Sequence, residues 1–120
     1  MRFDRRYTAA IFWILIAVVY AIAIMPSSSA PDLGAGDKIN HIAAFLTLTM
    51  VGRFAYRRAA SWRLALGLSL YGAVIELTQA IPALRRDASV WDWAADTAAI
   101  FLMLAICRFG ERWVPSRAAA

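Results

Sequence analysis

The residues best suited to chemistry in this chain are its single histidine and several acids beside apolar segments. Asp37 and His41 are four residues apart, as are Asp92 and Asp96, and residues at this spacing share one face of a helix. Glu76 lies inside an apolar run, before its C-terminal end. An imidazole exchanges protons near neutral pH. The pattern suits acid–base chemistry, with His41 as general base or proton carrier and Glu76 orienting it or holding a proton. Asp92 is the third candidate catalytic residue.

Further polar side chains accompany these residues and predict ligand binding. Lys38 and Arg86 suit a phosphate or a carboxylate, because charge-assisted hydrogen bonds are strong. Gln79 follows Glu76 on the same helical face. The expected ligand-binding residues are Asp37, Lys38, Gln79, Arg86, Ser89 and Asp96. A divalent cation held by Asp37, Asp92 and Asp96 is an alternative ligand, since such cations prefer oxygen.

Structural roles compete with these functional ones. Asp37 and Asp92 suit helix N-termini, where an acid stabilises the helix by about 0.3–1 kcal/mol. Ser89 with Asp92 resembles a capping box that has Asp in place of Glu, and a lone histidine is often structural. Glu76 is different, because the helix dipole opposes an acid in the C-terminal half of a helix. Glu76 is therefore the strongest indication of a functional site.

Four apolar segments must position these side chains. They span residues 7–25, 39–56, 64–81 and 91–107, close to the roughly 20 residues needed to cross a bilayer. Hydrophobic residues make up 62% of the chain, more than in most soluble domains. We expect an all-α integral membrane bundle of four transmembrane helices, arranged as two antiparallel hairpins in one domain over residues 1–120. The first segment exceeds the usual signal-peptide length, so we expect a retained span.

The basic residues predict the orientation in the membrane. One side would carry Arg2, Arg5, Arg6, Arg53, Arg57, Arg58, Arg63, Arg108, Arg112 and Arg117, and the other only Lys38, Arg85 and Arg86. The positive-inside rule then places both termini in the cytoplasm of a multi-pass inner-membrane protein. Topology explains the basic character, so nucleic acid is not an expected partner, whereas membrane lipids are. Interfacial positions are expected for Trp62, Trp91, Trp93 and Trp113.

The helix directions predict that the polar residues meet at the outer face. The segments 39–56 and 91–107 begin there, and the segment 64–81 ends there, so His41, Glu76 and Asp92 should form one cluster. Arg86 is expected to pair with Glu76 or Asp92. One face of the segment 64–81 is small and polar, as close helix packing requires: Ser69, Gly72, Ala73, Glu76, Gln79 and Ala80.

The ordered blocks Asp37-Lys38-x-x-His41, Glu76-x-x-Gln79 and Arg86-x-x-Ser89-x-x-Asp92-x-x-x-Asp96 resemble the VanZ-like family over residues 37–101. The resemblance implies a small multi-helix membrane protein, and the family takes its name from a protein linked to glycopeptide (teicoplanin) resistance. The family usually has Asn at the position of Asp96 and Gly at that of Ala99. It implies no particular reaction, because the family's biochemical activity is not generally established.

Three functions remain open on the sequence. The first is an outward-facing site that binds or acts on a cell-envelope molecule, such as a lipid-linked or peptidoglycan-related precursor or a lipophilic antibiotic. The second is a membrane scaffold or partner-docking protein whose polar cluster specifies helix packing. The third is a small proton-coupled transporter module. The sequence leaves catalysis, cofactor and oligomeric state undecided.

Overall fold

The computed structural model describes residues 4–26 and 37–113, which form four α-helices and one short 3-10 helix. The elements are α1 (Arg5–Ala23), α2 (Asp37–Ala55), α3 (Ser61–Gln79), η1 (Pro82–Leu84) and α4 (Val90–Trp113). The described residues contain no strand, which confirms the all-α expectation. Each expected span falls on one helix, although α4 continues past residue 107 to Trp113. Much of the expected external loop over residues 26–38 lies outside the described part.

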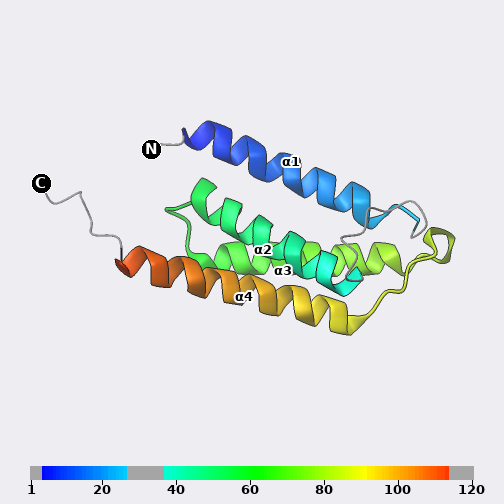
Figure 1. Cartoon of the computed structure of the whole chain (residues 1–120). Helices are drawn as coiled ribbons and strands as arrows, with labels where there is room; N and C mark the ends of the chain where they lie inside the picture. Colours follow the sequence, from blue (N-terminus) through cyan, green and yellow to red (C-terminus); the bar gives the residue numbers. More distant parts are fainter. Residues whose placement is uncertain (1–3, 27–36, 114–120) are drawn as a thin grey trace, which may run out of the picture.

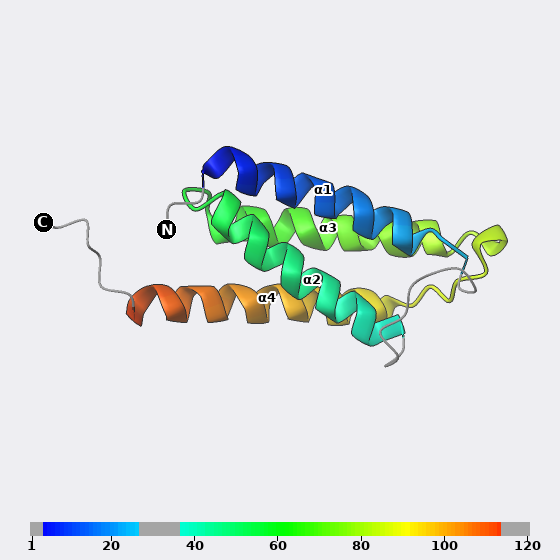
Figure 2. The same ribbon diagram turned by 45° about the horizontal axis from the view of Figure 1, so that its top comes forward.

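The helices alternate in direction along the bundle (Figures 1 and 2). Helices α1 and α2 pack as one antiparallel hairpin and α3 and α4 as the other, while α2 and α4 run parallel in close contact. One end of the bundle therefore holds the ends of α1 and α3 and the starts of α2 and α4; we call it the site end. The opposite end, which carries most of the arginines, is called the arginine end.

Local sequence explains where several helices begin. Asp4 precedes α1 and accepts a hydrogen bond from the backbone nitrogen of Arg6. Ser89 precedes α4, and its hydroxyl accepts a hydrogen bond from the backbone nitrogen of Trp91. Such caps satisfy backbone donors that have no partner within the helix. Helices of 19 residues are about 28 Å long, close to the roughly 30 Å hydrocarbon thickness of a bilayer.

Two of the four helices, α1 and α4, are long and apolar enough to cross a membrane. Helices α2 and α3 are not among them, and these two supply buried polar groups at His41, Glu76 and Gln79. The four-helix bundle is confirmed, while membrane crossing by all four helices stays a prediction.

The core of the bundle consists mainly of apolar side chains, with several buried polar groups among them. Phe45, Leu48, Ile75 and Ile100 are almost completely buried. Gly72 allows Phe45 to approach α3, because a Cβ there would lie 3.2 Å from the Phe45 ring. Fully buried polar residues at the same helix interfaces are Thr49, Gln79 and Asp96.

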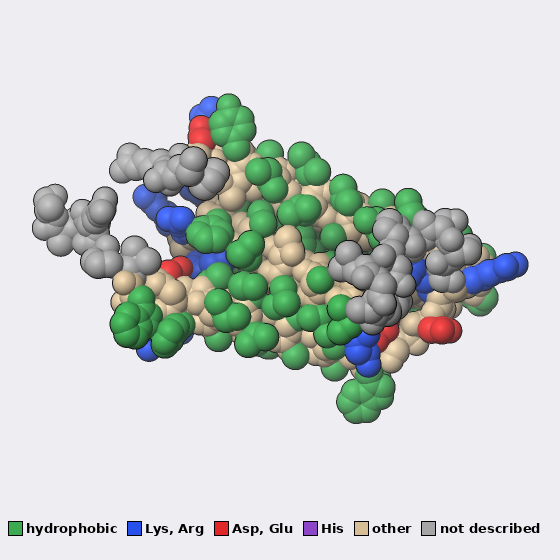
Figure 3. Space-filling view, viewed as in Figure 1, with side chains coloured by type: hydrophobic (Ala, Val, Ile, Leu, Met, Phe, Trp, Pro, Cys, Tyr) green, Lys and Arg blue, Asp and Glu red, His purple; other side chains and the backbone are tan. Residues whose placement is uncertain are grey.

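The outer surface is apolar in the middle of the molecule. Helix α3 exposes the stripe Leu66, Leu70, Val74 and Leu77. Figure 3 shows hydrophobic side chains over the middle of one face, with basic groups towards its two ends. The tryptophans Trp62, Trp91 and Trp113 are well exposed. Trp93 is less exposed, because its indole packs against α3 and donates to the carbonyl oxygen of Ser69, and its interfacial position stays a prediction.

Candidate functional site

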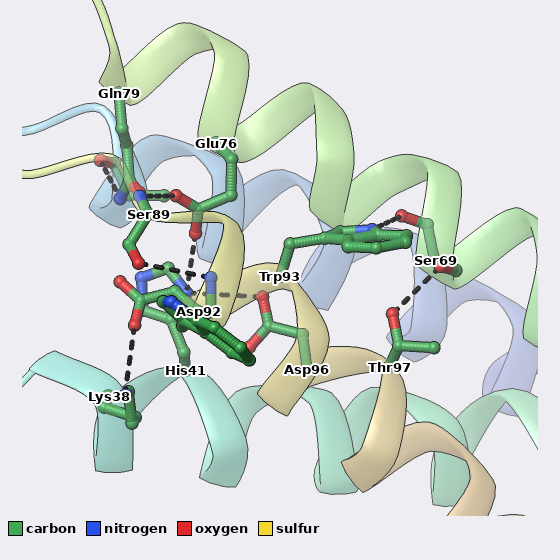
Figure 4. A network of polar contacts seen from close by, with 12 residues as sticks. Lys38, His41, Ser69, Glu76, Gln79, Ser89, Asp92, Trp93, Asp96 and Thr97 are labelled. Carbon is green, nitrogen blue, oxygen red and sulfur yellow. Dashed lines mark hydrogen bonds and ion pairs between the residues drawn. The ribbon is translucent and has the colours of Figure 1, made fainter.

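Three side chains from three helices converge near the site end (Figure 4). His41 of α2 places Nδ1 3.5 Å from Oδ2 of Asp96 on α4 and 3.8 Å from Oε1 of Glu76 on α3. Asp96 is fully buried, and His41 and Glu76 are each 9% exposed. We call these three residues the buried triad. The predicted meeting of His41 with Glu76 is therefore present, with Asp96 as the third member.

The connection between α3 and α4 fixes the carboxylate of Glu76. Its Oε2 accepts a hydrogen bond of 3.0 Å from the backbone nitrogen of Ser89, just before α4 begins. The same residue caps α4 with its hydroxyl. Ser89 thus couples the start of α4 to the orientation of Glu76, and its hydroxyl serves the helix cap that the sequence offered as an alternative to ligand binding.

Asp92 lies one helical turn before Asp96 on α4 and faces Lys38 of α2. Lys38 Nζ is 3.9 Å from Asp92 Oδ1. The Lys38 side chain is 56% exposed and the Asp92 side chain 13%, so this pair forms the rim of the buried triad. Asp92 was expected at the centre, but the structure gives that position to Asp96. The side chain of Asp37, the remaining expected residue of α2, lies outside the described part of the molecule.

Arg86 and Gln79 bind the C-terminal end of α1. Arg86 Nε donates to the carbonyl oxygen of Met25 at 2.7 Å, and its Nη2 donates to that of Ile22 at 3.0 Å. Gln79 Nε2 donates to the carbonyl oxygen of Ala23 at 3.0 Å. Carbonyl groups at a helix C-terminus lack regular intrahelical donors, although that of Ile22 also accepts a hydrogen bond from the backbone nitrogen of Met25. A cation suits this negative end of the helix dipole.

The expected pairing of Arg86 with Glu76 or Asp92 is therefore wrong. Among the described residues, neither carboxylate forms an ion pair with Arg86. The guanidinium is directed to α1 because carbonyl groups at a helix end lie within reach of the loop that carries it. Arg86 and Gln79 fasten α1 to the rest of the bundle beside the buried triad.

A polar ladder continues inward between α3 and α4. The indole nitrogen of Trp93 donates to the carbonyl oxygen of Ser69 at 3.0 Å, and Ser69 Oγ lies 3.0 Å from Thr97 Oγ1. Ser69 was predicted on a close-packing face, but no contact with Ser69 was predicted for Trp93 or Thr97. Thr97 follows Asp96 in the sequence. Its hydroxyl group within an apolar segment was the one sequence feature that could have indicated this contact.

A shallow groove of about 270 Å³ runs between α1 and α2 from the site end towards the middle of the bundle. Its lining is largely apolar, with two polar side chains from α2. The lining residues are Leu15, Val19, Asn40, Ala43, Ala44, Thr47 and Leu48. This groove was not predictable from the sequence, because the small residues of α2 indicate neither which face they occupy nor which helix lies opposite.

The geometry defines what the buried triad can do. One imidazole and two carboxylates can share protons, accept hydrogen bonds from a polar ligand or bind a metal ion. One candidate ligand atom from each of the three residues lies within 4.8 Å of the others. Of the three acids expected to share a cation, only Asp96 belongs to this group.

We found no family model, curated protein or solved structure that matches this chain.

Proposed function

We propose that this protein is a multi-pass inner-membrane protein that binds the polar head of an amphiphilic cell-envelope molecule at the site end. The observation that carries the proposal is the buried triad, which joins His41, Glu76 and Asp96 from three helices. Ionisable groups are costly inside an apolar bundle and usually serve a function there. The VanZ-like resemblance of the same sequence blocks agrees with such an envelope role.

The distribution of polar and apolar side chains supports the membrane setting. Leu70 and Leu77 of α3 and Phe101 of α4 are more than half exposed, whereas Asp96 and Gln79 are fully buried. Soluble monomers rarely expose contiguous apolar patches larger than a few hundred Å². We infer that α2 and α3 cross the bilayer together with α1 and α4, their polar groups turned inward.

The groove between α1 and α2 suits the apolar part of an amphiphile. Asn40 lines the groove and precedes His41 of the buried triad on α2. The remaining lining is mainly small or aliphatic, as a hydrocarbon chain requires. A head group recognised near Lys38 and the buried triad would leave its acyl or isoprenoid chain in this groove.

The competing function is a scaffold without a ligand, and one observation favours it. The buried triad is at most one-tenth exposed and its members face one another. Buried polar groups can specify helix packing without any ligand. The two functions predict different effects of removing one charge of the buried triad. A binding site would lose its amphiphile, whereas a scaffold would show no change in co-purified lipid.

Mass spectrometry of co-purified lipids separates these two functions. Lipids are extracted from the purified wild type and from the variants Glu76→Gln and Glu111→Gln. Glu111→Gln is the control, because it makes the same substitution at the arginine end. We expect an amphiphile enriched with the wild type and with Glu111→Gln, and reduced about tenfold or more with Glu76→Gln, because a hydrogen bond to a charged group is lost. Identical lipid profiles for all three proteins would favour the scaffold.

Reporter fusions test the orientation. Fusions after Ala120 and within residues 27–29 should report opposite sides of the membrane, with the C-terminal fusion in the cytoplasm. An external C-terminus would place the site end in the cytoplasm and would contradict an outer-leaflet ligand.

A further inference from the structure

We propose that His41, Glu76 and Asp96 together bind one divalent transition-metal ion, of which Zn²⁺ fits best. This inference extends the proposed function by naming an inorganic component of the same site. A role of the ion in binding the head group of the amphiphile rests on the proposed function. Binding of the ion itself rests on the geometry of the buried triad alone.

The separations within the buried triad fit a shared ion better than direct hydrogen bonds. His41 Nδ1 forms a long hydrogen bond of 3.5 Å with Asp96 Oδ2 and lies 3.8 Å from Glu76 Oε1. Nitrogen–oxygen hydrogen bonds are usually about 2.7–3.2 Å long. Ligands of a tetrahedral Zn²⁺ with bonds of about 2.0–2.2 Å are about 3.3–3.6 Å apart. The two distances to His41 therefore need only small shifts to suit an ion, and all three ligand atoms already lie within 4.8 Å of one another.

Glu76 is oriented as a ligand would be. Its Oε2 is held by the Ser89 backbone nitrogen, while its buried Oε1 has no hydrogen-bond partner among the described residues and lies towards His41. The side chain is nine-tenths buried. A buried oxygen without a donor is costly, whereas a bound cation would satisfy it. The hydrogen bond from Ser89 is the kind of outer contact that fixes metal ligands in place.

The charge of the site points the same way. Two carboxylates, those of Glu76 and Asp96, lie against one imidazole, and in the described residues no Lys or Arg forms an ion pair with Glu76. A neutral imidazole, two carboxylates and a divalent cation sum to zero charge. Neutrality matters in an apolar bundle, where a net charge is expensive. The alternative to a bound ion is a proton shared between the carboxylates of Glu76 and Asp96, which would also reduce the charge of the site.

The number and type of ligands favour a transition metal over Mg²⁺ or Ca²⁺. Imidazole suits zinc and its neighbours, while Ca²⁺ takes about 6–8 oxygen ligands and Mg²⁺ an octahedral set. Three protein ligands leave a coordination position open, as in catalytic zinc sites. An oxygen of the amphiphile's head group is the natural occupant of that position.

The sequence makes the test unusually clean, because His41 is the only histidine and Cys107 the only cysteine. The chain is purified in detergent without a polyhistidine tag, stripped with a chelator and titrated with ZnCl₂. Elemental analysis and the ¹⁵N resonances of the imidazole are then recorded. We expect one Zn²⁺ per chain and a shift of one His41 ring nitrogen. Millimolar MgCl₂ should not displace the ion, and Cys107→Ser should bind it equally.

Variants identify the ligands. Glu76→Gln and Asp96→Asn keep the shape of each side chain, and each should weaken Zn²⁺ binding by about 100-fold or more, since loss of outer contacts alone costs about 10–100-fold. Glu111→Gln should bind as the wild type does. The proposal is overturned if the wild type binds no Zn²⁺, if Mg²⁺ competes equally, or if Glu76→Gln and Glu111→Gln bind alike.

The metal titration separates this inference from the proposed function. It needs no amphiphile, so stoichiometric Zn²⁺ without any co-purified amphiphile would refute the head-group ligand and retain the ion. An amphiphile enriched with a chain that binds no Zn²⁺ would refute the ion and retain the head-group ligand.

Discussion

The two ends of the bundle carry similar residue types in opposite arrangements. At the arginine end, Arg53 pairs with Glu111 at 3.3 Å, and the Glu111 side chain is 53% exposed. At the site end, His41, Glu76 and Asp96 are buried against one another. Exposed charges are largely solvated and interact weakly, whereas buried charges depend on their partners. The basic residues therefore suit a role in topology, and the buried triad suits a binding site.

The basic side chains of the arginine end also pack on aromatic rings at the surface. The guanidinium of Arg57 lies 5.2 Å from the centre of the Phe54 ring, and that of Arg63 lies 5.5 Å from the Trp62 ring. Such contacts are modest at exposed sites. They indicate a surface arrangement, in contrast to the inward-facing groups of the site end.

The largest expected effect follows from removing one member of the buried triad. His41→Leu leaves two buried carboxylates without their imidazole, and we expect the free energy of unfolding to fall by about 3–5 kcal/mol. Thermal unfolding in detergent, measured against the wild type, checks this. A change as small as that of Glu111→Gln would mean that the imidazole does not stabilise these acids.

The second-largest loss of stability is expected for substitution of Arg86, because its guanidinium makes two hydrogen bonds to backbone carbonyl groups at the C-terminal end of α1. Lysine cannot reproduce this geometry, so Arg86→Lys should lower the free energy of unfolding by about 1.5–3 kcal/mol. Proteolysis near Met25 should also accelerate as α1 loosens. Arg85→Lys is the matched control and should change stability by less than about 0.5 kcal/mol. Equal effects at the two positions would contradict the anchoring role.

A smaller effect is expected for packing next to the buried triad. In Gly72→Ala, the added methyl group would lie 3.2 Å from Phe45, and overpacking of this kind costs about 1 kcal/mol. Gly67 on the same helix has open space around it, so Gly67→Ala should be neutral or stabilising. Thermal unfolding of the two variants compares them directly, and the reverse order would contradict the packing between α2 and α3.

The smallest effect belongs to the arginine end. Glu111→Gln removes the exposed pair with Arg53 and should cost at most about 1 kcal/mol. The difference from the wild type should shrink at high salt, because salt screens exposed pairs. A salt-independent loss of several kcal/mol would show that the two ends do not differ as described.

The sequence predicted the meeting of His41 with Glu76 because helix direction alone brings them to one end of the bundle. It did not predict that Asp96 rather than Asp92 completes the group. The two acids share a helical face, and the choice depends on how far α4 is shifted along α3. Contacts between α3 and α4, such as that of Ser89 with Glu76, accompany this shift and form only in the folded bundle.

The roles of Arg86 and Gln79 were not predictable for a related reason. Both donate to backbone carbonyls of α1, and a carbonyl group carries no signal in the sequence. Charge complementarity therefore favoured a carboxylate partner for Arg86 before the helix end was known to lie within reach. The four helices, by contrast, followed directly from apolar segments of the right length.

The most direct test of the account replaces the whole buried triad with apolar residues of similar size. The variant His41→Leu/Glu76→Met/Asp96→Val leaves no buried charge without a partner, and such replacements are often neutral or stabilising. Thermal unfolding and co-purified lipid are measured on the same sample. A site built for binding predicts wild-type or higher stability together with loss of the amphiphile. Lower stability with an unchanged lipid profile would show that the buried triad serves only to pack the helices.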